Sequence, residues 1–388
     1  MLMLKTAESV RAGHPDKLCD FIADTILDEA LYGDPAARVA VEVLATKARI
    51  YVAGEITSKV KVEIPAVVRR ALTQRGYNPR AFRIRVRVHR QSPDIAGGVD
   101  QSLEARRGQQ DAYAAISAGD QGTVYGYATN ETEERLPLPL VYAQRICQRL
   151  DEAFVDNKLP GLGIDGKAQV SIEYEDGQAK RVASVVVSVQ HKPGCNNDEL
   201  HSKIVSLIIA PACQELPIDE STEILINPSG RFITGGPEAD TGLTGRKLMV
   251  DTYGGLAPHG GGAFSGKDAS KVDRTGAYMA RLVARTLVDA KLAEEAQVSI
   301  SYAIGKADPV AFTVDTLGTG RFDDLQLAAA CVEVFPLRPA GMIEALDLGK
   351  HTNFRAYAAY GHFGHGYPTW ERAWAWVDKL REALGVQY

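Results

Sequence analysis

The chain has 388 residues, enough for two or three domains, and its 45% apolar and 24% charged residues are typical of a globular protein. A formal net charge of -5 argues against nucleic-acid binding through overall charge, and no run is long and apolar enough to predict a membrane span. Five widely spaced cysteines match no zinc-binding pattern, so we expect reduced thiols in a cytoplasmic protein.

An alternation of helices and strands begins near the N-terminus. Apolar spacing predicts a helix over 15–31, in which Pro15 suits the first helical position and Asp16 the first turn. Two strands, a helix and a third strand are then expected over 38–45, 50–56, 60–74 and 82–89.

The same alternation occurs twice more. In the second copy a helix, two strands, a helix and a strand are expected over 138–154, 169–174, 182–190, 198–213 and 223–226. A short strand is expected at 248–251. In the third copy a helix, two strands and two helices are expected over 270–291, 297–302, 310–314, 323–334 and 341–348. The pattern predicts an α+β protein of three similar units, each a small mixed sheet with helices on one face.

These units suggest domain boundaries. We expect an N-terminal unit over 1–91, a central unit over 118–232 and a C-terminal unit over 233–388 that carries a glycine-rich loop. The connection at 92–117 is rich in glycine, aspartate, glutamine and arginine and has little apolar periodicity. It is therefore expected to be a mobile loop beside the active site.

The glycine-rich loop at 260–274 joins three consecutive glycines to lysines, an arginine and aspartates just before a predicted helix. Backbone N–H groups and a helix N-terminus favour an anion, lysines add charge, and aspartates could hold a metal ion. Gly261, Gly266 and Lys267 fit a phosphate-binding P-loop, but Asp268 replaces the serine or threonine that would bind magnesium. The alternative is a glycine-rich surface turn followed by a solvated helix end.

Further candidates lie at the first helix and in other turns. His14 occupies the N-cap position, with Asp16 a candidate metal ligand and Lys17 a candidate phosphate ligand, although a capped helix with solvated charges would read the same way. Several cations lie in or beside glycine-rich turns, namely Arg231, Arg246, Lys247, Lys267 and Lys271. Such clustering with glycines and carboxylates favours a polyphosphate site over scattered surface charge.

Seven motifs together resemble the S-adenosylmethionine synthetase family in order and spacing. They lie at 14–17, 54–57, 91–95, 118–122, 242–247, 251–255 and 260–274. The resemblance implies that the methionine sulfur attacks C5′ of ATP and displaces triphosphate, which is then hydrolysed to pyrophosphate and phosphate. A highly anionic leaving group of this kind requires preorganised positive charge.

The resemblance also implies roles for individual residues. Catalytic roles fall to His14, Lys167, Arg246, Lys267 and Lys271. ATP contacts fall to His14, Asp165, Lys167, Arg231, Phe232, Asp240, Arg246, Lys247, Ala263 and Lys267. Methionine contacts fall to Glu55, Gln91, Asp120, Asp240, Lys271 and Ile304. Two Mg²⁺ ions per site would involve Asp16 and Asp273, and a K⁺ ion would involve Glu42.

The implied partners are ATP and L-methionine, in a homodimer or homotetramer with each site between two subunits, and neither nucleic acid nor membrane. Two alternatives remain: a non-catalytic regulatory homologue and another ATP-dependent phosphotransferase. Two departures from the family pattern are Ser117, where glycine is usual, and a longer segment over 100–117. A third is the strand at 82–89, whose alternating arginines need carboxylate partners or water.

Overall fold

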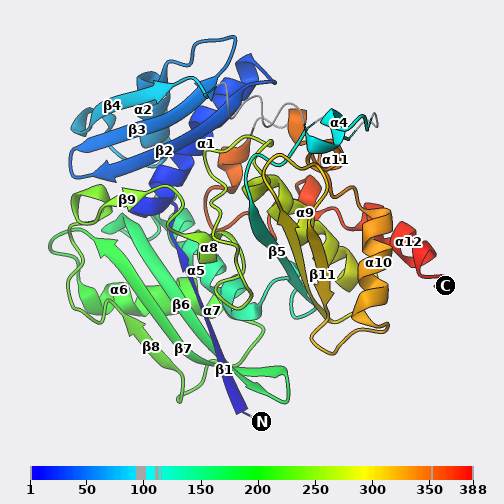
Figure 1. Cartoon of the computed structure of the whole chain (residues 1–388). Helices are drawn as coiled ribbons and strands as arrows, with labels where there is room; N and C mark the ends of the chain where they lie inside the picture. The colour runs from blue at the N-terminus through cyan, green and yellow to red at the C-terminus, as the bar shows by residue number, and fades with distance from the viewer. Residues whose placement is uncertain (1, 93–101, 110–112, 115, 351–352, 387–388) are drawn as a thin grey trace.

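The computed structural model describes residues 2–92, 102–109, 113–114, 116–350 and 353–386. Its strands form three small sheets with helices packed against them (Figure 1). The α+β class and the three-unit organisation expected from the sequence are thereby confirmed. Half of the expected loop at 92–117 lies outside the described residues, and its described part holds the one-turn helix α4 (Leu103–Arg106).

The N-terminal sheet has the strand order β4-β3-β2-β9. Its strands are β2 (Arg38–Thr46), β3 (Arg49–Thr57), β4 (Arg83–His89) and β9 (Gly242–Leu243). Helices α1 (Pro15–Gly33) and α2 (Ile64–Gln74) pack against it. The arginines of β4 lie on its exposed face, and the alternating apolar side chains pack toward the core, so water solvates these charges in the single chain.

The central sheet has the order β1-β6-β7-β8. Its strands are β1 (Leu2–Val10), β6 (Leu162–Glu175), β7 (Gln178–His191) and β8 (Glu223–Ile226). Helix α5 (Leu138–Val155) packs on β1 and β6, and the expected second helix is α6 (Asn197–Ile204), a π turn (Val205–Ile209) and α7 (Ala210–Ala212). The sequence did not predict β1, because its first half is exposed at an edge and shows no clean alternation.

The C-terminal sheet has the order β11-β10-β5. Its strands are β5 (Gly122–Thr129), β10 (Glu295–Tyr302) and β11 (Ala311–Asp315). Its helices are α9 (Val272–Asp289), α10 (Asp324–Val334), α11 (Pro339–Ala345) and α12 (Trp374–Ala383). Strand β5 lies within the range expected for the central unit but pairs with β10 in the C-terminal sheet, and it was not anticipated. At Gly126 a Cβ atom would lie 1.9 Å from the Ala280 carbonyl oxygen, so glycine lets β5 contact α9 closely.

The strand expected at 248–251 was wrong, because this segment is the one-turn helix α8 (Leu248–Asp251). A short apolar run does not distinguish a strand from a helix. Here Gly254 has a φ of 69° and donates its N–H to the Met249 carbonyl, which closes a turn that a strand would not make.

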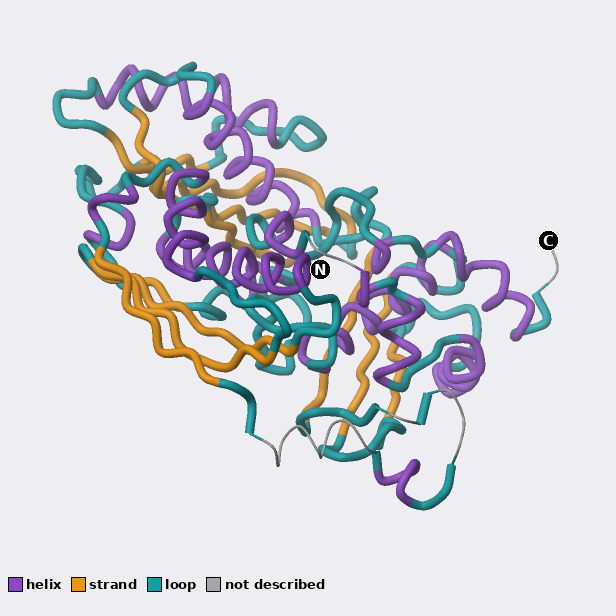
Figure 2. Tube along the Cα trace, turned by 90° about the horizontal axis from the view of Figure 1, so that it is seen from above, coloured by secondary structure: helices purple, strands orange, loops and turns teal. Residues whose placement is uncertain are grey.

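Two apolar cores hold the elements together. One is shared by the N-terminal and C-terminal sheets and buries α1 and α9, while the other lies between α5 and the central sheet. Figure 2 shows the long helices gathered beside the groups of strands. The shared core matters for function, because it fixes α1 against the glycine-rich segments of the C-terminal unit.

All five cysteines are free, and all but Cys195 are buried, as expected for reduced thiols. Among the described residues, no helix combines the length and apolar character required to cross a bilayer.

Candidate active site

The loop before α1 places the imidazole of His14. The His14 Nδ1 atom accepts a hydrogen bond from the Asp16 N–H at 3.2 Å, so the side chain caps the helix, and Tyr77 fixes the loop by donating to the Gly13 carbonyl at 2.6 Å. Burial, followed by the charge of Lys247, lowers the pKa of His14 to about 4. The ring is therefore neutral at physiological pH, and because Nδ1 is an acceptor, Nε2 carries the proton.

Asp16 ties α1 to the loop at 242–247. Its two oxygens accept hydrogen bonds from the Leu243 N–H at 3.0 Å and from Lys247 Nζ at 2.5 Å, and Arg246 Nε lies 3.9 Å away. Burial would raise the pKa of Asp16, but the bonds from Lys247 and Leu243 outweigh it and lower the pKa. His14, Asp16, Arg246 and Lys247 thus form one group, which we call the N-cap cluster.

The central sheet contributes to this cluster through an irregular stretch of β6. The buried Asp165 carboxylate accepts a hydrogen bond from the Gly236 N–H at 2.7 Å, and burial raises its pKa. Lys167 follows on the same strand with an exposed side chain. The charges of Lys167 and of the exposed Asp240 both affect the pKa of His14, so both residues lie near the N-cap cluster.

The segment at 227–232 follows β8 and carries the two predicted nucleoside contacts. Phe232 exchanges hydrogen bonds with His191, donating its N–H to Nε2 at 3.2 Å and accepting at its carbonyl from the His191 N–H at 2.8 Å. The Phe232 side chain is half-buried, and that of Arg231 is exposed. Neither side chain is buried in the core, so both can contact a ligand.

The glycine-rich loop holds a second group of charges. Lys267 Nζ lies 2.6 Å from Asp273 Oδ2, and both side chains are partly exposed. Lys271 pairs with Asp268 at 3.2 Å. Glu42 on β2 lies within the electrostatic reach of Lys267, although desolvation raises its pKa. We call Glu42, Lys267, Asp268, Lys271 and Asp273 the glycine-loop cluster.

Asp268 explains why the loop departs from a P-loop. Its carboxylate is 3% exposed and accepts hydrogen bonds from the Val39 N–H at 2.7 Å and the Ser270 N–H at 2.9 Å. Burial would raise its pKa, but Lys271 and these hydrogen bonds lower it. Asp268 therefore fastens the loop to β2 and does not correspond to the magnesium-binding hydroxyl of a P-loop.

Gly245 and Ala263 bring the two loops together. A Cβ atom on Gly245, whose φ is 74°, would lie 2.5 Å from the Ala263 Cβ atom. Glycine therefore permits a close approach of the loop at 242–247 to the loop at 260–267. The two loops, each of which carries residues of one cluster, touch at this point.

The predicted methionine contacts are more scattered. Glu55 lies 3.2 Å from His89 Nε2, Gln91 donates its N–H to Thr57, and Asp120 accepts from the following N–H. Ile304 is 61% exposed. Among the residues that the structure describes, no hydrogen bond or ion pair joins these four to the two clusters.

Lys17 is not a phosphate ligand, contrary to the expectation from the sequence. Its side chain is fully buried and lies 2.9 Å from Asp20 and 2.5 Å from Asp251. Burial would lower the pKa of Lys17, but these two carboxylates raise it. Lys17 is thus a structural cation inside the shared core.

Sequence reasoning missed a ladder of aspartates along α1. Besides Asp16, Asp20 accepts a hydrogen bond from the Gly245 N–H at 2.8 Å. Asp24 accepts from the Gly266 N–H at 2.8 Å, and Asp28 from the Phe354 N–H at 2.7 Å. The regular spacing of four residues was the available signal, since it places all four side chains on one face of a helix.

The chain matches three family models over most of its length. They describe the N-terminal domain of S-adenosylmethionine synthetase at residues 2–93, the central domain at 115–232 and the C-terminal domain at 234–372. It is also 47% identical to an S-adenosylmethionine synthase from Desulforudis audaxviator (strain MP104C), an alignment that covers 98% of this chain and 97% of that protein. The chain therefore belongs to the S-adenosylmethionine synthetase family.

Proposed function

We propose that the protein is a methionine adenosyltransferase, which makes S-adenosylmethionine from ATP and L-methionine. The methionine sulfur attacks C5′ of ATP, the C5′–oxygen bond breaks, and the triphosphate leaves with the electron pair. The bound triphosphate is then hydrolysed to pyrophosphate and phosphate. The observation that supports this best is the concentration of cations on two touching glycine-rich loops in a chain of net negative charge.

The cations would stabilise the negative charge that develops on the leaving group. The side chains of Lys167 and Arg246 are exposed. Those of Lys247, Lys267 and Lys271 are partly exposed, so all five can reach a ligand. His14 would donate a hydrogen bond from Nε2 to the oxygen that leaves C5′. Its neutral form suits this role, because a neutral donor keeps its proton over the whole physiological range.

Carboxylates beside these lysines fit a magnesium site. Asp16 and Asp273 each accept a hydrogen bond from a lysine. No group of three or more carboxylate, histidine or cysteine side chains able to hold a metal occurs in the described ranges. Magnesium is commonly held by one or two carboxylates together with phosphate oxygens and water, so single aspartates suffice. When bound, the metal would neutralise part of the triphosphate charge, and Glu42 would serve K⁺.

The substrates would be recognised by groups around the two clusters. Arg231, Phe232, Asp165, Asp240 and Ala263 would contact ATP. Methionine would be positioned by Glu55, Gln91, Asp120, Asp240, Lys271 and Ile304. In the part of the chain that the structure describes, Glu55, Gln91, Asp120 and Ile304 form no hydrogen bond or ion pair with the two clusters. We propose that a second subunit completes each site.

One assay tests the proposal. The protein is incubated with ATP, methionine, Mg²⁺ and K⁺, and the products are identified by mass spectrometry. We expect S-adenosylmethionine, pyrophosphate and phosphate. Formation of ADP would instead indicate a phosphotransferase. No turnover together with tight binding to another synthetase would indicate a regulatory homologue.

A loop variant tests the assignment of the site. Lys267→Ala should lower turnover at least about 100-fold, since removal of one preorganised group from a transition-state site has an effect of this size. Its circular dichroism and thermal midpoint should stay near those of the parent. Lys61→Ala is the matched control, because the Lys61 side chain is 84% exposed and pairs with the surface residue Glu63. Parental activity in Lys267→Ala would exclude this lysine from the site.

A further inference from the structure

One buried ion pair holds the backbone of the glycine-rich loop. Asp24 on α1 and Arg274 on α9 are both fully buried, and their charged groups lie 2.5 Å apart. They are separated by 250 residues of sequence. The pair therefore joins the N-terminal and C-terminal units at one point of the shared core.

The two side chains hold both ends of one dipeptide. Asp24 Oδ1 accepts a hydrogen bond from the Gly266 N–H at 2.8 Å, and Arg274 Nε donates to the Lys267 carbonyl at 2.9 Å. From the other side, Val41 donates its N–H to the Gly266 carbonyl at 3.0 Å. Gly266 has a φ of 79°, so the chain reverses tightly just before Lys267. Little freedom remains in the backbone that carries the Lys267 side chain.

Arg274 is itself fixed by a chain of contacts. Its Nη1 donates to the Tyr278 hydroxyl at 2.8 Å, and that hydroxyl lies 2.7 Å from His362 Nδ1. The ring of Phe354 covers the guanidinium, with its centroid 4.4 Å from Cζ. Each nitrogen of the guanidinium therefore has a hydrogen-bond partner, and its Nε–H points toward the loop.

A buried ion pair is weak evidence for stability, because the cost of removing two charges from water offsets much of their attraction. The contacts support a role in positioning better than a role in stability, since each charged side chain also binds a backbone group of the dipeptide. We propose that Asp24 and Arg274 are positioning residues, which hold the Lys267 backbone so that its ammonium group meets the triphosphate. This inference rests on the proposed function of Lys267.

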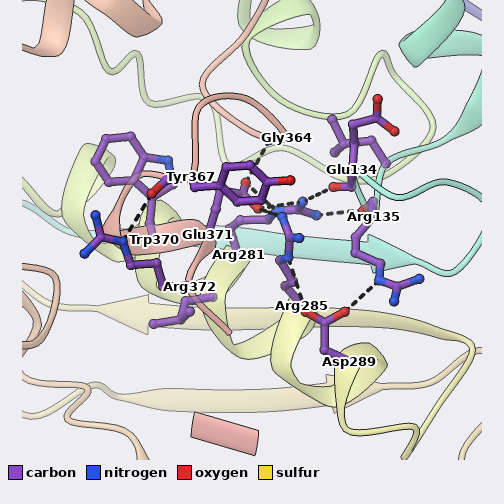
Figure 3. A network of polar contacts seen from close by, with 12 residues as sticks. Glu134, Arg135, Arg281, Arg285, Asp289, Gly364, Tyr367, Trp370, Glu371 and Arg372 are labelled. Carbon is purple, nitrogen blue, oxygen red and sulfur yellow. Dashed lines mark hydrogen bonds and ion pairs between the residues drawn. The ribbon is translucent and has the colours of Figure 1, made fainter. Parts of the chain in front are cut away.

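The same helix provides a matched comparison. Arg281, two turns after Arg274 on α9, is also fully buried and binds Glu371 with two contacts of 3.0 Å (Figure 3). Its remaining bonds go to the carbonyls of Tyr127, Glu134 and Arg135. This network supports β5 and the segment at 361–372, and none of its contacts reaches the glycine-rich loop.

The test compares Arg274→Lys with Arg281→Lys. Each change keeps the positive charge but removes a planar guanidinium that binds several partners at once. Both variants should show a lowered thermal midpoint. Isothermal titration with tripolyphosphate in Mg²⁺, well below both midpoints, should show at least a tenfold loss of affinity for Arg274→Lys only. We expect Arg281→Lys to stay within twofold of the parent.

Two milder variants keep the test decisive if Arg274→Lys does not fold. Asp24→Asn keeps an oxygen acceptor for the Gly266 N–H and loses the charge, and Tyr278→Phe removes only the hydroxyl that orients Arg274. Both should weaken tripolyphosphate binding by threefold or more while the KM for methionine changes little. A merely structural role would lower the thermal midpoint and leave the affinity of the folded protein unchanged.

Lys267→Ala distinguishes failure of the positioning proposal from failure of the proposed function of Lys267. If it weakens tripolyphosphate binding but folded variants of Asp24, Arg274 and Tyr278 bind normally, the positioning role is refuted and the function of the loop stands. If Lys267→Ala itself binds normally, the proposed function of this lysine is refuted.

Discussion

The neutral state of His14 makes a quantitative prediction about stability and pH. An unfolded chain has a histidine pKa near 6.5, whereas burial and Lys247 lower the folded pKa of His14 to about 4. Between these values the unfolded state binds more protons, so the stability associated with His14 is complete above pH ~6.5 and is lost as the pH falls toward 4. From about pH 7.5 to about pH 4.5 the loss should reach about 2.5 kcal/mol.

His14→Asn isolates this contribution. Asparagine is a preferred N-cap residue, so its side chain can still accept the Asp16 N–H, but it does not titrate. Urea unfolding of both proteins across this pH range should give a free-energy difference that grows toward acid, with the parent losing more stability. In parallel, NMR should follow the His14 ring as it titrates.

Two results would contradict this account of His14. One is a midpoint near 6.5 for the His14 ring, and the other is parallel stability curves for the two proteins. Lys247→Met serves as a control for the cause: it should raise the pKa of His14 but leave it below 6.5, because burial is the larger cause.

Two further substitutions, each with a control, test the geometry of the fold. Gly266→Ala should destabilise the protein by about 2–4 kcal/mol, because the new Cβ would lie 2.2 Å from the Val41 carbonyl at a positive φ. Gly261→Ala, also at positive φ but with open space around it, should cost about 1 kcal/mol, and equal thermal midpoints would refute the steric argument. Glu371→Gln should cost about 3–5 kcal/mol, because it leaves the buried Arg281 and Arg285 without their shared carboxylate. The surface change Glu63→Gln should alter unfolding by less than about 1 kcal/mol, and a similar small effect for Glu371→Gln would show that the network in Figure 3 is not needed.

The periodic helices and most strands could be predicted because their signals are local. Helix α5 begins at Leu138 as expected, and α1 begins at Pro15 behind a side-chain cap. Strands β1 and β5 could not be assigned to their sheets, since each pairs with a segment far away in the chain. Sequence periodicity can indicate that a segment forms a strand, but it does not indicate which strand it pairs with.

The candidate site divides in the same way. Gly266 and Lys267 stand out in the sequence because glycine and lysine chemistry is visible residue by residue. The role of Asp268 could not be seen in the sequence, because it depends on hydrogen bonds from the N–H groups of Val39, far away in the chain, and of Ser270. Lys17 was misassigned for a related reason: burial between Asp20 and Asp251 turns a charged residue from a ligand into a structural group.

The resting site is balanced in charge, and this balance has a consequence for ligand binding. Lys247 pairs with Asp16, and Lys267 with Asp273, so each candidate phosphate ligand neutralises a candidate metal ligand. An anion that draws either lysine away leaves a carboxylate without its counter-charge. A divalent cation is the natural replacement, so metal and triphosphate should each favour the binding of the other, by the same factor in both directions. If the proposed function holds, the site would bind the metal–polyphosphate complex more tightly than either component alone. The aspartates that pair with the lysines would be the cause of this preference.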